Sequence, residues 1–201
     1  MPSLYLVRHG ETRPTPSQDP RLWELTDKGK RDARALGRLI PWDSVGKVVA
    51  SPESKAQQTA HWLTLGTPFN HELEVLDGLH ELAAPFVSDP LLFRSQLQAY
   101  FAGKPQPGWE PLEAARMRIL DALDHALTLA FPKAAVAVSH GRILTVLLSA
   151  ITGRLPSLDA WEKIAMPDLA RVNLEHRVIE IPFGITLHPD RGNMPTGKPR
   201  I

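Results

Sequence analysis

The chain of 201 residues contains no cysteine. This absence excludes disulfide bonds, thiol catalysis and cysteine-bound metals, and it is typical of a protein from a reducing compartment. An excess of charge of one sign is also missing, because 23 basic residues are balanced by 22 acidic ones and the formal net charge is +1. Such a balance does not favour a nucleic-acid-binding surface, so we expect no nucleic-acid partner.

Long apolar runs free of polar residues are absent as well. The most apolar stretch, residues 135–148, has His140 and Arg142 near its middle, which favours a buried strand passing into a helix over a membrane span. The opening "MPSLYLVRHG" lacks the basic segment, apolar core and cleavage site of a secretory signal. We therefore expect a cytoplasmic protein with no membrane partner.

The composition, 43% hydrophobic and 22% charged, is that of a folded protein, and the length suits one domain over residues 1–201. Residues 4–7 form a short apolar run typical of a strand that is covered on both faces. A helix follows, with Thr26 as its N-cap and Pro41 as its end. Residues 48–50 then predict a strand, which precedes a helix that ends near Gly66.

The same order of strand and helix returns further along the chain. Residues 112–130 carry apolar side chains at intervals of three and four, which predicts a long helix. A strand at 134–138 and a helix at 142–151 follow. This alternation predicts an α/β fold with a mostly parallel central sheet and helices on both faces.

Two segments lack this regular pattern. Residues 78–110 contain four prolines and three glycines with weak periodicity, and we expect them to form a lid insertion over one end of the sheet. Residues 170–181 predict two short strands with a turn near Glu175. The remaining residues, 182–201, are expected to form an irregular tail.

Two of the predicted strands end in the same way, with a histidine followed by glycine. "LYLVRHGET" brings Arg8 and His9 to the end of the first strand, and "AVAVSHG" brings His140 to the end of another. In parallel sheets, ligand sites lie at the carboxyl ends of the strands. The turn that carries Lys55 and the helix that begins near Arg142 should reach the same crevice, where the helix adds backbone N–H groups.

Cations gathered in one crevice repel each other unless an anion lies between them, and a phosphoryl group fits both the charge and the hydrogen-bond donors. A neutral imidazole can attack phosphorus and form a phosphoramidate that water later hydrolyses. The departing alkoxide needs an acid, for which Glu81 is the candidate because burial would raise its pKa. Glu72, Glu74 and Asp77 lie near it in sequence and remain alternatives. We expect a small phosphorylated substrate.

Six segments occur in an order that resembles the histidine phosphatase superfamily, which includes the cofactor-dependent phosphoglycerate mutases. In chain order they are "LVRHGET", "LTDKGKRDARALG", "SPESKAQQTA", "LHEL", "WEPLEAARMR" and "VAVSHG". The resemblance covers roughly residues 3 to 152 and implies a phosphoglycerate mutase-like fold. It further implies that His9 is the phosphorylated nucleophile, that Arg8 and His140 hold the phosphoryl oxygens, and that Glu81 is the proton donor.

The chain departs from this family in three places, one of which is Arg142, where many relatives have a small residue. Lys55 stands where the family usually has arginine, and an ammonium group cannot form a bidentate clamp, although Arg13 or Arg142 could compensate. The loop "RPTPSQDPRLWE" lacks the asparagine and the Gln-Gly pair that the mutases carry. These departures argue against a glycolytic mutase. Within the helix after Lys55, we interpret Thr59 as a packing residue.

The sequence thus predicts a metal-independent phosphomonoesterase of the histidine acid phosphatase type, without a cofactor. The histidines show no metal-ligand spacing, so no metal site is expected. A phosphomutase and a catalytically weak relative that binds phosphorylated ligands remain alternatives. Neither the substrate's identity nor an oligomeric state is indicated. The predicted catalytic residues are His9, Glu81 and His140, and the predicted substrate-binding residues are Arg8, Lys55 and Arg142.

Overall fold

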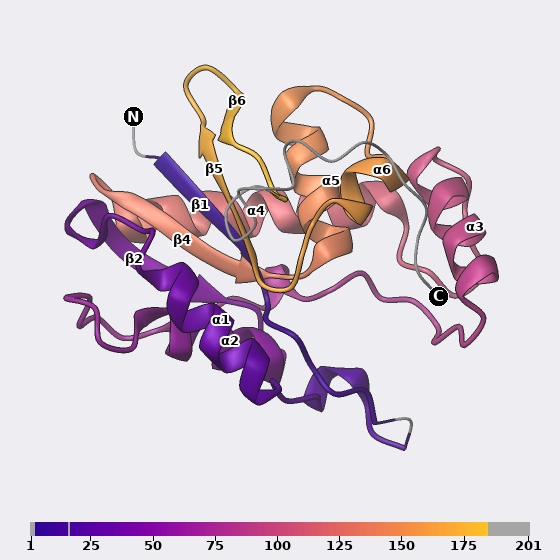
Figure 1. Cartoon of the computed structure of the whole chain (residues 1–201). Helices are drawn as coiled ribbons and strands as arrows, with labels where there is room; N and C mark the ends of the chain where they lie inside the picture. Colours follow the sequence, from indigo (N-terminus) through magenta and orange to yellow (C-terminus); the bar gives the residue numbers. More distant parts are fainter. Residues whose placement is uncertain (1–2, 16, 185–201) are drawn as a thin grey trace, which may run out of the picture.

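A six-stranded sheet of order β3-β2-β4-β1-β5-β6 forms the centre of the computed structural model, which describes residues 3–15 and 17–184 (Figure 1). Strands β1 to β4 are parallel, whereas β5 runs antiparallel to β1 and β6 antiparallel to β5. The predicted mostly parallel sheet is confirmed. The strands are β1 (Ser3–Arg8), β2 (Val45–Ala50), β3 (Glu74–Val75), β4 (Ala134–Ser139), β5 (Asp168–Asn173) and β6 (Val178–Ile181).

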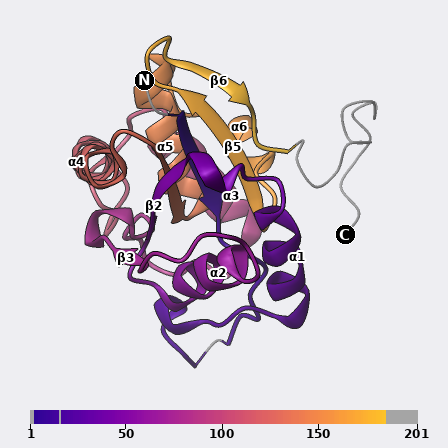
Figure 2. The same ribbon diagram turned by 90° about the vertical axis from the view of Figure 1, so that its left-hand side faces the viewer.

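Helices cover both faces of the sheet (Figures 1 and 2). Strand side chains alternate between the faces, so Tyr5 and Val7 pack under α1 and α2, while Leu4 and Leu6 pack against α4 and α5. In the described part of the chain, no helix combines the length and apolarity needed to cross a membrane. The helices are α1 (Asp27–Gly37), α2 (Ser54–Thr64), α3 (Pro90–Phe101), α4 (Leu112–Ala130), α5 (Gly141–Thr152) and α6 (Leu158–Glu162).

Helix α1 begins as its sequence predicts but ends earlier. The Thr26 hydroxyl accepts the N–H of Gly29 at 3.0 Å, which confirms the N-cap. The helix ends at Gly37 instead of Pro41, and the Trp42 indole N–H donates to the Gly37 carbonyl at 2.7 Å. A Cβ atom on Gly37 would lie 2.0 Å from a backbone oxygen of α2, so this glycine allows α1 and α2 to pack closely.

Residues 78–110 are less irregular than their sequence suggests, because they contain α3. Asp89 caps this helix by accepting the N–H of Leu91 at 2.8 Å. Its apolar pattern is obscured because α3 buries Leu97 and Tyr100 but exposes Leu91. The sequence pattern does not predict β3 or α6. Whether the segment acts as a lid stays a prediction, as does the single-domain organisation.

The C-terminal strands agree with the prediction. β5 and β6 pair antiparallel on either side of the turn near Glu175. Of the predicted irregular tail, residues 182–184 continue from β6 without regular structure. Residues 185–201 lie outside the described residues.

The carboxyl ends of β1, β2 and β4 meet at one edge of the sheet. Arg8 is in register with Ser139, and Ala50 with Val138. The next residue on β1 extends this pairing, since the N–H of His9 donates to the Ser139 carbonyl at 3.0 Å. Three loops therefore leave the sheet side by side, and they carry the residues of the candidate site.

Candidate active site

His9 follows β1 and is almost completely buried, with 7% of its surface exposed. Its Nδ1 lies 2.8 Å from the Gly10 carbonyl oxygen, which can only accept a hydrogen bond, so Nδ1 carries the proton. Burial lowers the pKa of His9 to about 3, and the charges of Arg8 and Lys55 act in the same direction. Nε2 of a neutral ring therefore keeps a lone pair that can attack an electrophile.

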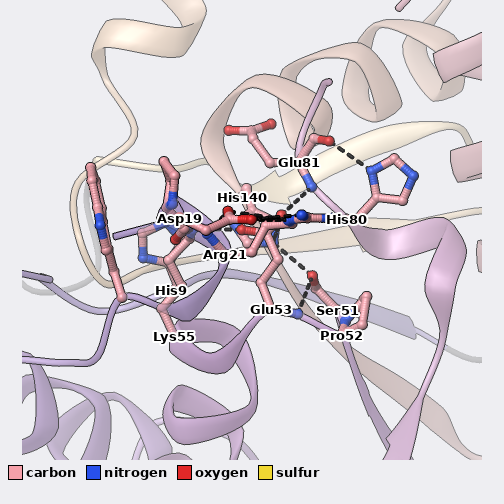
Figure 3. A network of polar contacts seen from close by, with 12 residues as sticks. His9, Asp19, Arg21, Ser51, Pro52, Glu53, Lys55, His80, Glu81 and His140 are labelled. Atoms are coloured by element: carbon pink, nitrogen blue, oxygen red, sulfur yellow. Dashed lines mark hydrogen bonds and ion pairs between the residues drawn. The ribbon is translucent and has the colours of Figure 1, made fainter. Parts of the chain in front are cut away.

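His140 follows β4, and its ring centroid lies 5.1 Å from that of His9. The side chain is fully buried, and Nε2 lies 2.8 Å from the Ser51 hydroxyl (Figure 3). Nδ1, the other ring nitrogen, is buried without a hydrogen-bond partner in the described residues. Burial holds the pKa of His140 well below its ordinary value, and the neighbouring His9 and Lys55 add to this effect.

Arg8 lies at the end of β1 with its guanidinium against the first turn of α5. One terminal nitrogen donates to the Ile164 carbonyl at 2.5 Å, whereas Nε is buried without a partner in the part of the chain that the structure describes. A Cβ atom on Gly141 would lie 3.0 Å from both Nε and Cζ of Arg8. The glycine after His140 is thus what lets the helix begin so close to this cation.

Two buried nitrogens at these strand ends, Nε of Arg8 and Nδ1 of His140, have no hydrogen-bond partner in the described residues. Buried polar groups in proteins are almost always hydrogen-bonded, so an exception calls for an explanation. An anion placed between these two residues and His9 would accept a hydrogen bond from the Arg8 Nε–H. The geometry supports the prediction that these strand ends bind a phosphoryl group.

Lys55, near the start of α2, is buried beside the two histidines but already has partners. Its Nζ donates to the Glu53 carboxylate at 2.5 Å and to the Pro20 carbonyl at 2.8 Å. The indole ring of Trp23 lies 6.0 Å from the same nitrogen. Lys55 thus reaches the predicted crevice, but as half of a buried ion pair rather than as a free cation. Its contact with a phosphoryl group stays a prediction.

Glu53 is a residue of this site that the sequence pattern does not single out. Its side chain is 6% exposed, and its Oε1 accepts the backbone N–H of Glu81 at 2.8 Å and lies 3.4 Å from Nε2 of His140 (Figure 3). One carboxylate therefore contacts three loops of the site. The spacing in the sequence could have indicated this role, because an acidic residue two positions before Lys55, in a turn that follows a strand, can form an ion pair with the lysine.

Glu81 lies at the N-terminus of α5, where its carboxylate accepts backbone N–H groups. Oε1 accepts from Ile143 at 3.0 Å and from Leu82 at 2.9 Å. Oε2 lies 3.3 Å from the Nε of Arg142 and 3.3 Å from its backbone nitrogen. The carboxylate thus complements the positive end of the helix dipole.

The expectation that the pKa of Glu81 is raised is wrong for this structure. Burial does raise the pKa of Glu81, but the Arg142 guanidinium and the two backbone N–H groups outweigh burial and leave the pKa below its usual value. The carboxyl is therefore ionised when no substrate is bound. Its role as a general acid stays a prediction.

Arg142 comes from the first turn of α5 and is held by the segment that was expected to form a lid. Its guanidinium carbon lies 5.8 Å from the ring centroid of Phe93 and 5.7 Å from that of Trp109. Cations are attracted to aromatic faces at such distances. Arg142 thus connects Phe93 and Trp109 to Glu81. Its predicted contact with substrate stays a prediction.

Two polar residues around the loop after β1 have clearer roles than their sequence suggested. The hydroxyl of Thr59 accepts the N–H of Gly10 at 2.9 Å, so Thr59 does more than pack α2. Glu11 accepts a hydrogen bond from the Thr26 hydroxyl at 2.8 Å, which links this loop to the N-cap of α1. Both contacts hold the loop that directly follows the nucleophile candidate His9.

A family model of the histidine phosphatase superfamily (branch 1) matches residues 4–180. The chain belongs to this superfamily. The resemblance inferred from the six sequence segments is therefore confirmed, and superfamily membership supports a phosphatase or mutase activity. Within residues 3–15 and 17–184, no three histidine, aspartate or glutamate side chains are grouped so that they could hold a metal ion.

Solved structures of this superfamily share the fold over nearly the whole chain. YhfR of Bacillus stearothermophilus is 22% identical with a TM-score of 0.69, and the match covers 92% of this chain and 97% of that one. A phosphoserine phosphatase mutant of Entamoeba histolytica, in complex with phosphoserine, is 20% identical with a TM-score of 0.68 and coverages of 94% and 99%. No curated protein sequence matches the chain.

A third similar structure is the mycobacterial glucosyl-3-phosphoglycerate phosphatase Rv2419c. It is 19% identical with a TM-score of 0.66, and the match covers 85% of this chain and 89% of that one. At such identities the likeness shows the fold alone. What each superfamily member does depends on the residues at its strand ends.

Proposed function

We propose that the protein is a phosphomonoester hydrolase that works through a phosphohistidine intermediate on His9 without a metal ion. The observation that carries this proposal is the hydrogen bond from Nδ1 of His9 to the Gly10 carbonyl, because it leaves Nε2 free to attack. The low pKa of His9, about 3, keeps that nitrogen unprotonated at neutral pH. The unpartnered Nε of Arg8, the residue before His9, suits a phosphoryl oxygen.

The proposed reaction has two steps. Nε2 of His9 forms a bond to phosphorus while the P–O bond to the alcohol breaks, and the departing oxygen takes a proton from Glu81. A water molecule then attacks phosphorus and gives a proton to Glu81, while the P–N bond breaks and returns its electron pair to Nε2 of His9, so that inorganic phosphate is released. The alcohol and phosphate together account for all atoms of the ester and the water.

Glu81 must hold a proton for the first step, although its pKa is lowered when no substrate is bound. A phosphoryl dianion bound next to Glu81 would raise the pKa of this carboxyl group, because a nearby like charge disfavours the ionised form. The dianion also competes with Glu81 for the Arg142 guanidinium. Substrate binding would thus convert a helix-capping carboxylate into an acid.

The substrate class we propose is a small phosphomonoester. The similar structure of an Entamoeba histolytica phosphoserine phosphatase contains phosphoserine, which supports a substrate of this size. The mutase alternative would pass the phosphoryl group from His9 to a second hydroxyl instead of to water. It has less support here, since the loop at residues 13–24 lacks the mutase features.

One observation favours a second candidate, a relative that binds phosphorylated ligands without turnover. Lys55 is neutralised by Glu53, and Glu81 is held as a carboxylate, so one predicted substrate-binding group and one predicted catalytic group are engaged within the protein. A protein with these features could hold a phosphate ester in the crevice and leave it intact.

A screen of phosphomonoesters for released phosphate, with a chelator present, tests the proposal. We expect metal-independent release from at least one small ester, and rapid quenching at neutral or alkaline pH should trap an acid-labile phosphoryl group on the protein. His9→Ala should abolish both. Tight ester binding without release would favour the binding relative, a strict metal requirement would exclude the mechanism, and transfer to an added alcohol would favour the mutase.

A further inference from the structure

The buried carboxylate of Glu53 is shared between Lys55 and His140, which come from different loops. We propose that Glu53 is a positioning residue that acts through His140, by holding the proton on Nε2 so that Nδ1 takes up a second proton when a phosphoryl group binds. This inference rests on the proposed function, because it concerns the same phosphoryl site.

The arrangement around Nε2 of His140 determines where the ring carries its proton. Oε1 of Glu53 lies 3.4 Å from this nitrogen, and the Ser51 hydroxyl lies 2.8 Å from it. A carboxylate oxygen can only accept, so a ring with its proton on Nε2 is favoured over one with a lone pair directed at the carboxylate. Nδ1, which has no partner in the described residues, is then the free acceptor of the ring.

A neutral ring whose Nδ1 carries no proton cannot donate a hydrogen bond from this nitrogen to a phosphoryl oxygen. In the free protein it stays neutral, because burial and the neighbouring His9, Lys55, Arg142 and Arg8 hold the pKa of His140 well below its ordinary value. A phosphoryl dianion offsets these cations. The imidazolium that then forms would have a counter-charge on each side, with Glu53 at Nε2 and the phosphoryl group at Nδ1.

The proton for Nδ1 can come from the ligand itself. A phosphate monoanion carries one P–OH group beyond those of the dianion, and transfer of that proton breaks one O–H bond and forms one N–H bond. The products are a bound dianion and an imidazolium whose Nδ1–H donates to it, which is a short, charge-assisted hydrogen bond. No further reagent is involved.

The two oxygens of Glu53 support a role beyond neutralising Lys55. Oε2 accepts from Lys55 Nζ at 2.5 Å, whereas Oε1 faces His140 and accepts the backbone N–H of Glu81 at 2.8 Å. A carboxylate that served the lysine alone would not need its second oxygen fixed against the imidazole. Figure 3 shows Glu53 between the loops that carry these partners.

The experiment compares Lys55→Gln with the double variant that also carries Glu53→Gln. Neither protein has the lysine charge, so they differ only in the charge of residue 53, and glutamine retains an acceptor for the Glu81 N–H. Side-chain ¹⁵N NMR would follow the histidines with inorganic phosphate bound and a chelator present, and His140→Asn would assign the signal. A second pair, wild type against Glu53→Gln, keeps Lys55 and serves if Lys55→Gln does not fold.

We expect phosphate to convert His140 to its imidazolium at neutral pH when Glu53 is present. Glu53→Gln should lower the proton affinity of His140 in the phosphate complex by about tenfold or more, on the scale of a charge removed within 4–6 Å. Equal proton affinities in both pairs would overturn the inference and leave Glu53 as the partner of Lys55 alone. Wild-type protein that does not bind phosphate would instead overturn the proposed function itself.

Discussion

The hydroxyl of Thr59 in α2 accepts the backbone N–H of Gly10 at 2.9 Å and donates to the Lys55 carbonyl at 2.6 Å. One side chain thus ties the residue that follows His9 to the helix that carries Lys55. The Gly10 carbonyl, in turn, sets the protonated nitrogen of His9. The orientation of the nucleophile candidate therefore depends on a hydroxyl that does not itself touch the imidazole.

Replacing Thr59 by valine should test this dependence. Thr59→Val keeps the shape of the side chain but leaves the buried Gly10 N–H without an acceptor, which typically costs about 1–3 kcal/mol in the free energy of unfolding. We expect urea denaturation to show this loss and phosphate release to slow. Thr59→Ser keeps the oxygen and is the matched control. A Thr59→Val protein as stable and active as Thr59→Ser would contradict the role.

The strand ends of the site follow directly from the sequence. Apolar runs of strand length that each end in a His-Gly pair predict two parallel strands, and the carboxyl ends of parallel strands meet at one edge. His9 and His140 could therefore be placed together before their geometry was known. The helix periodicity around residues 112–130 was equally informative, because a long helix with one buried face repeats its pattern many times.

The remaining features depend on tertiary contacts that a sequence pattern does not show. α3 exposes Leu91 and buries Leu97, so its apolar residues do not mark a single face. Burial raises the pKa of Glu81, but Arg142 and the N-terminus of α5, which are distant in sequence, lower the pKa below its usual value. Glu53 does not stand out as a motif of its own. Its role depends on contacts between the loops that follow β2, β4 and the 3-10 helix η3 (Asp77–Leu79).

The ion pair between Lys55 and Glu53 should matter more for stability than surface pairs do. Lys55→Met leaves the Glu53 carboxylate buried without its partner, and the expected loss is about 3–5 kcal/mol in the free energy of unfolding. Adding Glu53→Gln to Lys55→Met removes the buried, unpaired carboxylate and should recover most of the lost free energy of unfolding. Urea denaturation measures both, with the exposed Lys104→Met as control. A loss that the second substitution does not recover would argue against a buried pair.

The low pKa of His9 predicts a stability that depends on pH. The folded chain keeps His9 neutral down to about pH 3, whereas the unfolded chain protonates it near the ordinary value of 6.5. The unfolded state therefore binds more protons as the pH falls below 6.5, so acid destabilises the fold in this window by up to about 1.4 kcal/mol per pH unit. His140, whose pKa is also lowered, acts in the same direction.

Urea denaturation between about pH 7.5 and about pH 5, above the ordinary range of carboxyl groups, measures the contribution of the buried histidines. The free energy of unfolding should fall as the pH falls, and His9→Asn should give a shallower slope. His61→Asn changes an exposed histidine of α2 and should keep the wild-type slope. Parallel curves for wild type and His9→Asn would show that His9 is not held neutral by the fold.

Glu81 is the residue whose chemical role differs most between the sequence and the structure. As the proposed acid it must protonate a departing alkoxide, whereas a nitrophenolate departs without help. Glu81→Gln should therefore slow the hydrolysis of alkyl phosphates by roughly a hundredfold or more, the usual scale of acid catalysis, and affect nitrophenyl phosphate much less. The rates are compared on one enzyme preparation with a chelator present.

The helix-capping contacts of Glu81 make a second explanation testable in the same comparison. Glutamine can still accept the N–H groups of Leu82 and Ile143 through its carbonyl oxygen, but it loses the charge that faces Arg142. If Glu81 served only to hold α5 and Arg142, both substrates would be slowed equally and the protein would be less stable. Unequal losses with unchanged stability support acid catalysis, because only the alkyl ester needs the proton. Equal losses would make Glu72, Glu74 and Asp77 the next candidates for the acid.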